Sequence, residues 1–273
     1  MNWLKRYDLI VFLVLAFALA WWLWPFVLAN PESTPLLPWS PIIAAFIVLA
    51  LTRGWAGVRD LLRSIVRWRV GLQWYAVALL LPVAITLLAL YLNALFGGPT
   101  PTVADFAPLS TLPLVFLSTT LINGPFTEEP GWRGFLLPRL QSSYTPVVAS
   151  LIVGVIWAIW HLPLLLSDPT GQRPPLQFFV VLVAQSVVFT WVYNGTRGSV
   201  LLVILMHGMF NSFVRLMAPV VFGSAAYGVF WWLQAVLWWV VALAAIAVFG
   251  MASERAPSME APATAAATAA RVR

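Results

Sequence analysis

The residues best able to do chemistry in this chain are ionisable groups within long apolar stretches. Its two histidines, His161 and His207, lie inside such stretches, and a third stretch ends at Glu128 and Glu129. Ionisable groups are costly in a membrane interior and usually serve a function when they occur there. A glutamate, two histidines and the nearby Asn211 are suited to moving protons and activating water. The sequence therefore predicts one site built from three segments.

The acidic motif gives its two carboxylates different expected roles. Glu129 and Arg133 are four residues apart, the spacing at which an acidic and a basic side chain meet on a helix. Glu128 then points elsewhere without a local partner, which suits a general base. Pro130 predicts a kink or a restart of the helix at this point. The alternative is a helix that ends at the membrane interface with solvated charges.

Each histidine also has a neighbour one helical turn away. Trp157 precedes His161 by four residues, and Asn211 follows His207 by four, so each pair shares a helix face. His207 and Asn211 could donate two hydrogen bonds to a developing oxyanion, ligate a metal, or hold helices together. His161 could equally be a buried histidine hydrogen-bonded to a neighbouring helix. Gly208 predicts a close approach by another helix or by a substrate backbone.

Composition indicates where these groups lie. The chain of 273 residues is 62% hydrophobic and 9% charged, with a mean hydropathy of +0.90, which indicates a polytopic membrane protein. It has no cysteine, which excludes disulfides and a thiol nucleophile. The net charge of +6 does not indicate nucleic acid, because the basic residues are spread over short loops.

The apolar windows predict an all-α membrane bundle of about eight transmembrane helices. They fall near residues 9–29, 37–52, 72–96, 108–127, 146–166, 176–194, 199–219 and 226–250. The first window is interpreted as a retained span rather than a signal peptide cleaved after Ala29, because it is long and rich in tryptophan. Residues 1–252 are expected to form the transmembrane helical domain, and residues 253–273 a disordered C-terminal tail.

The distribution of basic residues predicts the orientation in the membrane. If both termini are cytoplasmic, the inside segments hold 13 of the 15 basic residues, and only Arg173 and Arg215 lie outside. The stretch from Arg53 to Arg69 is interpreted either as a basic amphipathic helix on the cytoplasmic surface or as a simple stop-transfer loop. We expect an integral protein of a bacterial plasma membrane, with its site reached from the cytoplasmic side.

A simple depth argument leaves one conflict. From a turn expected near Tyr144-Thr145-Pro146, Glu128 and His161 both lie roughly 24 Å along their helices at about 1.5 Å per residue. His207 would lie only roughly 12 Å into its own helix by the same rise. These depths agree only if residues 131–143 lie partly in the membrane interface or protrude from it.

The three motifs together resemble a known family. The patterns EExxxR, aromatic-xxxH and HxxxN occur in this order on separate apolar segments. This set resembles the CPBP family of CAAX-processing and bacteriocin-processing intramembrane proteases, also called Abi proteins. The resemblance covers about Leu112 to Leu216, which indicates a protease core near residues 108–219. Trp157 stands where that family usually has phenylalanine.

The resemblance implies a role for each motif residue. Glu128 would activate the attacking water, His161 would help to hold it, and His207 with Asn211 would stabilise the oxyanion. Supporting structural roles would fall to Glu129, Arg133 and Trp157. The family has been read both as metal-dependent and as metal-free. We favour no metal, since Asn is an uncommon zinc ligand, but a divalent ion such as zinc on Glu128, His161 and His207 is the alternative.

The leading hypothesis is an intramembrane endopeptidase that acts on a peptide or membrane-protein substrate in the lipid bilayer. Two alternatives use the same bundle. The first is a non-proteolytic scaffold or bacteriocin-immunity-type protein, which retention of every motif residue argues against. The second is a proton-coupled transporter, which the lack of an internal repeat argues against. The substrate, whether it is prenylated, and the oligomeric state are left open.

Overall fold

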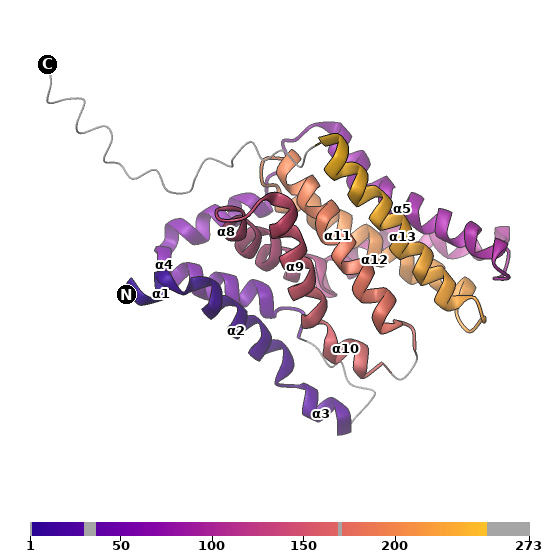
Figure 1. The fold of residues 1–273 in the computed structure, drawn as a ribbon, viewed down its shortest axis with the longest axis horizontal. Coiled ribbons are helices and arrows are strands. Elements are labelled where there is room, and N and C mark those ends of the chain that lie inside the picture. The colour runs from indigo at the N-terminus through magenta and orange to yellow at the C-terminus, as the bar shows by residue number, and fades with distance from the viewer. Residues whose placement is uncertain (1, 30–36, 169–170, 250–273) are drawn as a thin grey trace, which may run out of the picture.

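In the computed structural model, which describes residues 2–29, 37–168 and 171–249, every regular element of these residues is a helix (Figure 1). The elements are α1 (Asn2–Arg6), α2 (Asp8–Trp21), α3 (Trp24–Ala29), α4 (Ser40–Ile65), α5 (Leu72–Leu95), the 3-10 helix η1 (Val103–Thr111), α6 (Leu112–Ile122), α7 (Pro125–Glu129), the π-helix η2 (Pro130–Leu136), α8 (Leu137–Gln141), α9 (Pro146–Trp160), α10 (Leu162–Leu166), α11 (Pro175–Gly195), α12 (Val200–Val221) and α13 (Tyr227–Phe249). The predicted all-α membrane bundle is confirmed.

Seven helical stretches of the described residues are long and apolar enough to cross a membrane. They are Asp8–Phe26, Ser40–Ile65, Leu72–Leu95, Val103–Gln141, Pro175–Gly195, Val200–Val221 and Tyr227–Ala247. The remaining predicted window, near 146–166, holds the shorter helix α9 of 15 residues. Helix α9 begins at the predicted turn, with Thr145 as its N-cap, and is followed by His161. Each of the eight predicted windows therefore contains a helix.

The helices pack around one apolar core. Helix α11 lies between α9 and α13, as Figure 1 shows. Helix α12 packs against α5 and α6. Helix α2 joins this core through Phe12, whose ring stacks on Phe135 at 4.6 Å between centroids. An ion pair of 2.7 Å between Asp8 and Arg139 links α2 to α8. The first apolar segment is thus an integral part of the bundle.

Helix α4 changes direction at Gly54, which adopts the left-handed φ of 61° that favours glycine. Beyond it, Leu61 and Ile65 are buried while Arg59 and Arg63 are exposed. The basic stretch is therefore an amphipathic helix as far as Ile65, and only its last part, Arg67 to Arg69, is loop. The simple-loop interpretation is wrong for most of the stretch.

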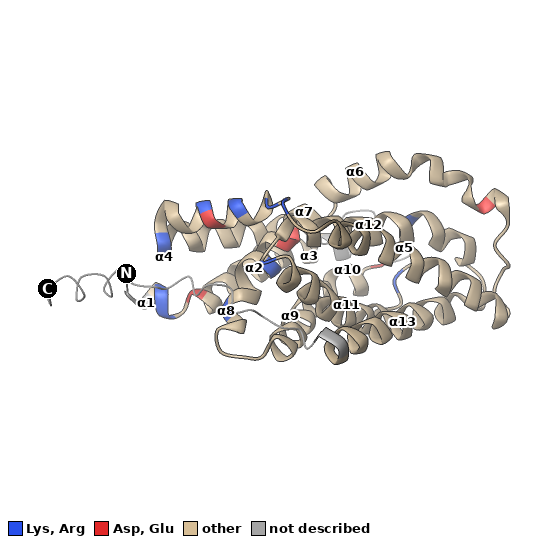
Figure 2. Ribbon diagram, turned by 90° about the horizontal axis from the view of Figure 1, so that it is seen from above, with Lys and Arg blue, Asp and Glu red and all other residues tan. Residues whose placement is uncertain are grey.

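Basic side chains gather at one end of the molecule. Figure 2 shows blue segments on α1, on the far half of α4 and beside α8 at the same end. This arrangement agrees with the predicted clustering of basic residues on one side, and the orientation of that end in a membrane stays a prediction. The predicted tail, 253–273, lies outside the described residues.

Candidate active site

The acidic motif sits where one helix type gives way to another. Gly124, with φ of 113°, starts the short helix α7, and its carbonyl accepts the backbone N–H of Glu128 at 2.7 Å. At Pro130 the chain enters the π-helix η2. In place of the predicted kink or restart, the chain changes from α-helix to π-helix at this proline and keeps right-handed helical φ and ψ. Turns of π-helix are found disproportionately at functional sites, because they shift the side chains that follow.

The segment after the glutamates, on which the depth argument depends, is buried inside the protein. Trp132, Phe135 and Leu136 are almost completely buried, so this part of the chain lies within the protein and does not protrude. Gly131 and Gly134 permit this, because a Cβ on either would lie within 2.5 Å of a side chain of α4. Counting 1.5 Å per residue from the turn failed because the segment is a π-helix followed by a short α-helix, not one straight span.

Glu129 and Arg133 form a fully buried ion pair. Arg133 Nη1 donates to both carboxylate oxygens of Glu129 at 3.0 Å, as the spacing of four predicts. Its Nε and Nη2 atoms have no hydrogen-bond partner among the described residues. The guanidinium instead lies 4.5 Å from the ring centroid of Trp157 and 5.0 Å from that of Phe189. Such cation–π contacts offset part of the cost of burying the charge.

The same carboxylate of Glu129 links the acidic motif to helix α12. His207 Nδ1 lies 2.8 Å from Glu129 Oε1, and His207 Nε2 lies 3.1 Å from Asn211 Nδ2. Because a carboxylate can only accept, Nδ1 carries a proton. In neutral His207, Nε2 is then the acceptor of a hydrogen bond from the Asn211 amide. The predicted pairing of His207 with Asn211 on one face is present.

Glu128 is buried and has a partner that its local sequence does not reveal. Its Oε2 atom accepts a hydrogen bond of 2.6 Å from the indole Nε1 of Trp157. Its Oε1 atom lies over Gly124, where a Cβ would be 2.4 Å away. The expectation that Glu128 points away from Glu129 and lacks a local partner is met, since Trp157 is 29 residues distant.

His161 lies at the C-terminal end of α9. Its Nδ1 atom is 2.8 Å from the carbonyl oxygen of Trp157, so Nδ1 carries the proton and Nε2 keeps its lone pair in the neutral ring. The imidazole is also packed between aromatic rings, with Trp160 at 4.8 Å and Phe178 at 5.8 Å between centroids. The predicted proximity of Trp157 and His161 is therefore present, through a backbone contact as well as a ring contact.

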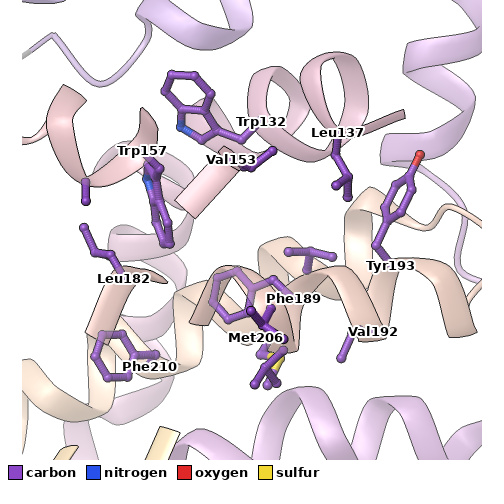
Figure 3. Close-up of a cluster of buried hydrophobic side chains, with 14 of the residues drawn as sticks. Trp132, Leu137, Val153, Trp157, Leu182, Phe189, Val192, Tyr193, Met206 and Phe210 are labelled. Atoms are coloured by element: carbon purple, nitrogen blue, oxygen red, sulfur yellow. The ribbon is translucent and has the colours of Figure 1, made fainter. Parts of the chain in front are cut away.

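Trp157 connects the three predicted motifs. Its indole N–H contacts Glu128, its carbonyl contacts His161, and its ring lies 5.2 Å from that of His207. Figure 3 shows Trp157 beside Phe189 among the buried side chains. Sequence reasoning placed Trp157 on the face of His161 but missed its bond to Glu128, and it missed the link of Glu129 to His207. No local pattern signals contacts across 29 and 78 residues.

The donor set fits a metal poorly. Among the described residues, no group of three or more His, Cys, Asp or Glu side chains is arranged to hold an ion. Glu129 occupies one ring nitrogen of His207 and Asn211 the other, so ligation through His207 would displace one of them. The alternative set of Glu128, His161 and His207 would therefore require rearrangement of these side chains to bind an ion.

An apolar cavity of about 470 Å³ lies next to the site. Thr120 and Phe116 of α6 line it, and both approach Gly208, where a Cβ would be only 2.1 Å from Thr120 Oγ1. The close helix approach predicted at Gly208 is thus made by α6. The remaining lining residues are almost all apolar and come from α4 and its following loop, α6, α7 and α12: Ile65, Val66, Trp68, Leu117, Leu121, Phe126, Leu201, Ile204 and Leu205.

A membrane bundle that buries groups able to activate water and to stabilise an anion is the class of structure expected of an intramembrane peptidase. Two comparisons agree. Residues 110–213 match the family described as type II CAAX prenyl endopeptidase Rce1-like. A relative named CAAX prenyl protease 2, from Methanococcus maripaludis, is 28% identical over 195 residues, which cover 66% of this chain and 70% of that protein. Both comparisons support an intramembrane endopeptidase of the CPBP type.

Proposed function

We propose that this protein cleaves a peptide bond with a water molecule activated by Glu128. The observation that carries the proposal is the position of Trp157, which holds Glu128 by its indole and His161 by its carbonyl within one buried site. Both remaining acceptors, Glu128 Oε1 and His161 Nε2, are then available to the two hydrogens of one water. A water held in this way loses a proton to the carboxylate as its oxygen attacks the substrate carbonyl.

The oxyanion formed by that attack is assigned to Asn211 and His207. The Asn211 amide has a second hydrogen besides the one directed at His207 Nε2. His207 can donate from Nε2 only when it carries both ring protons. The Asn211 amide then no longer donates to Nε2, and the carboxylate of Glu129 at 2.8 Å from Nδ1 balances the charge of the ring. As the tetrahedral intermediate collapses, the C–N bond breaks and the proton held by Glu128 passes to the leaving amine nitrogen.

The direct test uses a substitution that keeps the shape of Glu128. In Glu128→Gln the amide oxygen can still accept from Trp157, but the side chain cannot take a proton. We expect cleavage to fall by about 10²–10⁴-fold while the protein still inserts and purifies normally. Membranes from cells expressing either form are compared by labelling new protein N-termini. Fragments that persist with the variant would show that another group activates the water.

We further propose that the reaction needs no metal. Binding of a divalent ion to His207 would compete with contacts that the chain itself makes at both ring nitrogens. Purified active protein is expected to contain no stoichiometric zinc by elemental analysis and to keep its activity after dialysis against a chelator. Activity that is lost on chelation and restored by zinc would support the alternative set of ligands.

The apolar cavity supports a substrate with a large apolar part. Its volume lies within the range of about 300–1,000 Å³ typical of ligand sites. The named relative is a CAAX prenyl protease, and we propose that this chain likewise accepts a substrate whose lipid group or apolar side chains enter the cavity beside Gly208. Such a substrate would enter laterally from the lipid bilayer, between α6 and α12.

Filling the cavity tests this assignment. Leu205→Trp should slow cleavage of a farnesylated CAAX peptide more than that of a long apolar peptide without the lipid. Val236→Trp, on an exposed face of α13, is the matched control and should change neither rate. Equal loss with both peptides would indicate that the cavity does not hold the lipid group.

A further inference from the structure

We infer that Trp157 is a positioning residue that fixes which oxygen of Glu128 acts as the base. The inference rests on the proposed role of Glu128. The indole Nε1–H donates to Oε2 at 2.6 Å, a short distance for a hydrogen bond to a carboxylate. An indole nitrogen can only donate, so this contact does not reverse. It leaves Oε1, the oxygen over Gly124, as the atom that receives the proton of the water.

The indole can hold the carboxylate because it is itself immobile. Trp157 is completely buried, and neighbours surround its ring. The guanidinium of Arg133 lies 4.5 Å from its centroid, the ring of His207 lies 5.2 Å away, and that of Phe189 lies 5.9 Å away. Rotation of the side chain would break all of these contacts together. The direction of the Nε1–H bond is therefore set by the packing of α9 against η2, α11 and α12.

The opposite side of the carboxylate is equally constrained. Oε1 lies so close to Gly124 that any side chain there would collide with it. Among the described residues, no donor is hydrogen-bonded to Oε1. The carboxylate thus has one oxygen held by a fixed donor and one oxygen left for water.

The same residue also aligns the second group that contacts the water. His161 directs Nδ1 at the Trp157 carbonyl, which fixes the plane of the ring and leaves Nε2 as the acceptor. A single residue therefore orients both the base and its partner, one through the side chain and one through the backbone. Small errors in such alignment are costly, since misplacement by about 1 Å can reduce a rate by about 10²-fold.

The test removes the donor and keeps an aromatic ring. Trp157→Phe should lower kcat by about tenfold to 10²-fold with KM changed less than about twofold, since the indole is completely buried in the protein. Trp238→Phe is the matched control. Trp238 is also completely buried, packs on Phe189, and its Nε1 has no hydrogen-bond partner among the described residues. Its truncation should leave kcat within about twofold of the wild type.

A second variant separates the hydrogen bond from the volume of the ring. Replacing Trp157 alone by 3-benzothienylalanine puts sulfur in place of the N–H and preserves the bicyclic shape. Site-specific incorporation is required, because the chain has 16 tryptophans. The same loss of kcat as in Trp157→Phe would establish the hydrogen bond as the cause. A wild-type kcat with this analogue would overturn the inference, even if Trp157→Phe fails to fold.

A double-variant comparison distinguishes this inference from the proposed function. In the Glu128→Gln background, Trp157→Phe should cause little further loss, because there is no base left to orient. If Glu128→Gln alone keeps full activity, the proposed function fails. If Glu128→Gln is inactive but the benzothienyl protein is fully active, only the role of Trp157 fails.

Discussion

Glu129 Oε1 lies 2.8 Å from His207 Nδ1, and the same carboxylate accepts both hydrogen bonds of Arg133 Nη1 at 3.0 Å. The acidic motif and helix α12 are therefore joined by a charge that lies wholly inside the protein. Glu129 contacts both Arg133 and His207, whereas its neighbour Glu128, the proposed base, contacts Trp157. The two adjacent glutamates therefore have different partners, each on another part of the fold.

Removing one partner of this buried ion pair should be far more damaging than removing both. Arg133→Met leaves the Glu129 carboxylate without its cation and should destabilise the protein by about 3–5 kcal/mol. The double variant Glu129→Gln/Arg133→Met should recover much of that stability, because no uncompensated charge remains. Unfolding in detergent mixtures measures the free energy of unfolding of the single and the double variant. A double variant less stable than Arg133→Met would show that the pair is not coupled in this way.

Asn211→Ala should leave the fold intact and slow the reaction. Asn211 is only half buried and its side chain is hydrogen-bonded to His207, so little packing is lost. Loss of one oxyanion donor costs about 10²–10³-fold in kcat, and KM should change little. Steady-state rates on a purified substrate give kcat and KM of the variant and the wild type. A change confined to KM would place Asn211 in substrate binding instead.

Gly208 should tolerate no side chain while α6 keeps its position. A Cβ at Gly208 would lie 2.1 Å from Thr120 Oγ1, so Gly208→Ala is expected to cost about 1–3 kcal/mol. Thr120→Ala should relieve part of this cost, because it removes the colliding oxygen. Gly228→Ala is the matched control, since the nearest atom there is 3.9 Å away. Thermal unfolding is compared for the wild type, Gly208→Ala, Gly208→Ala/Thr120→Ala and Gly228→Ala. Equal destabilisation at both glycines would contradict the assigned helix contact.

The absence of cysteine makes the orientation directly measurable. Single substitutions at two exposed loop positions, Ser143→Cys and Thr100→Cys, should fall on opposite sides of the membrane. An impermeant maleimide added to intact cells is expected to label Thr100→Cys only, because the basic residues predict residues 128–145 to be cytoplasmic. Labelling of Ser143→Cys instead would invert the orientation and place the access to the site outside.

Sequence periodicity identified contacts between residues one helical turn apart and failed for contacts between segments distant in the sequence. The spacing of four predicted both Glu129 with Arg133 and His207 with Asn211, and both contacts are present. The hydrogen bond from Trp157 to Glu128 joins two helices, and nothing in the local pattern of either specifies their relative rotation. The chain's apolar windows likewise predicted where the helices lie, because burial in lipid demands length and hydrophobicity.

The parts that sequence reasoning did not reach depend on irregular backbone. The π-helix at Pro130–Leu136 shifts the register of the side chains after the glutamates, and a rise per residue taken from an ideal helix cannot describe it. The basic stretch after Arg53 had two interpretations because its charges suit either a loop or a helix. Burial of Leu61 and Ile65 decides for the helix, and that burial depends on tertiary packing.

The ion pair of Glu129 and Arg133 also bears on how the chain enters a membrane during synthesis. Its two members are separated by a single helical turn, so they can neutralise each other before any other helix has arrived. The segment is then inserted into the membrane as a neutral ion pair. Insertion of an isolated cation into lipid would cost more free energy. Arg133, which is buried in the folded site, therefore has Glu129 as its counter-ion as soon as this helical turn forms.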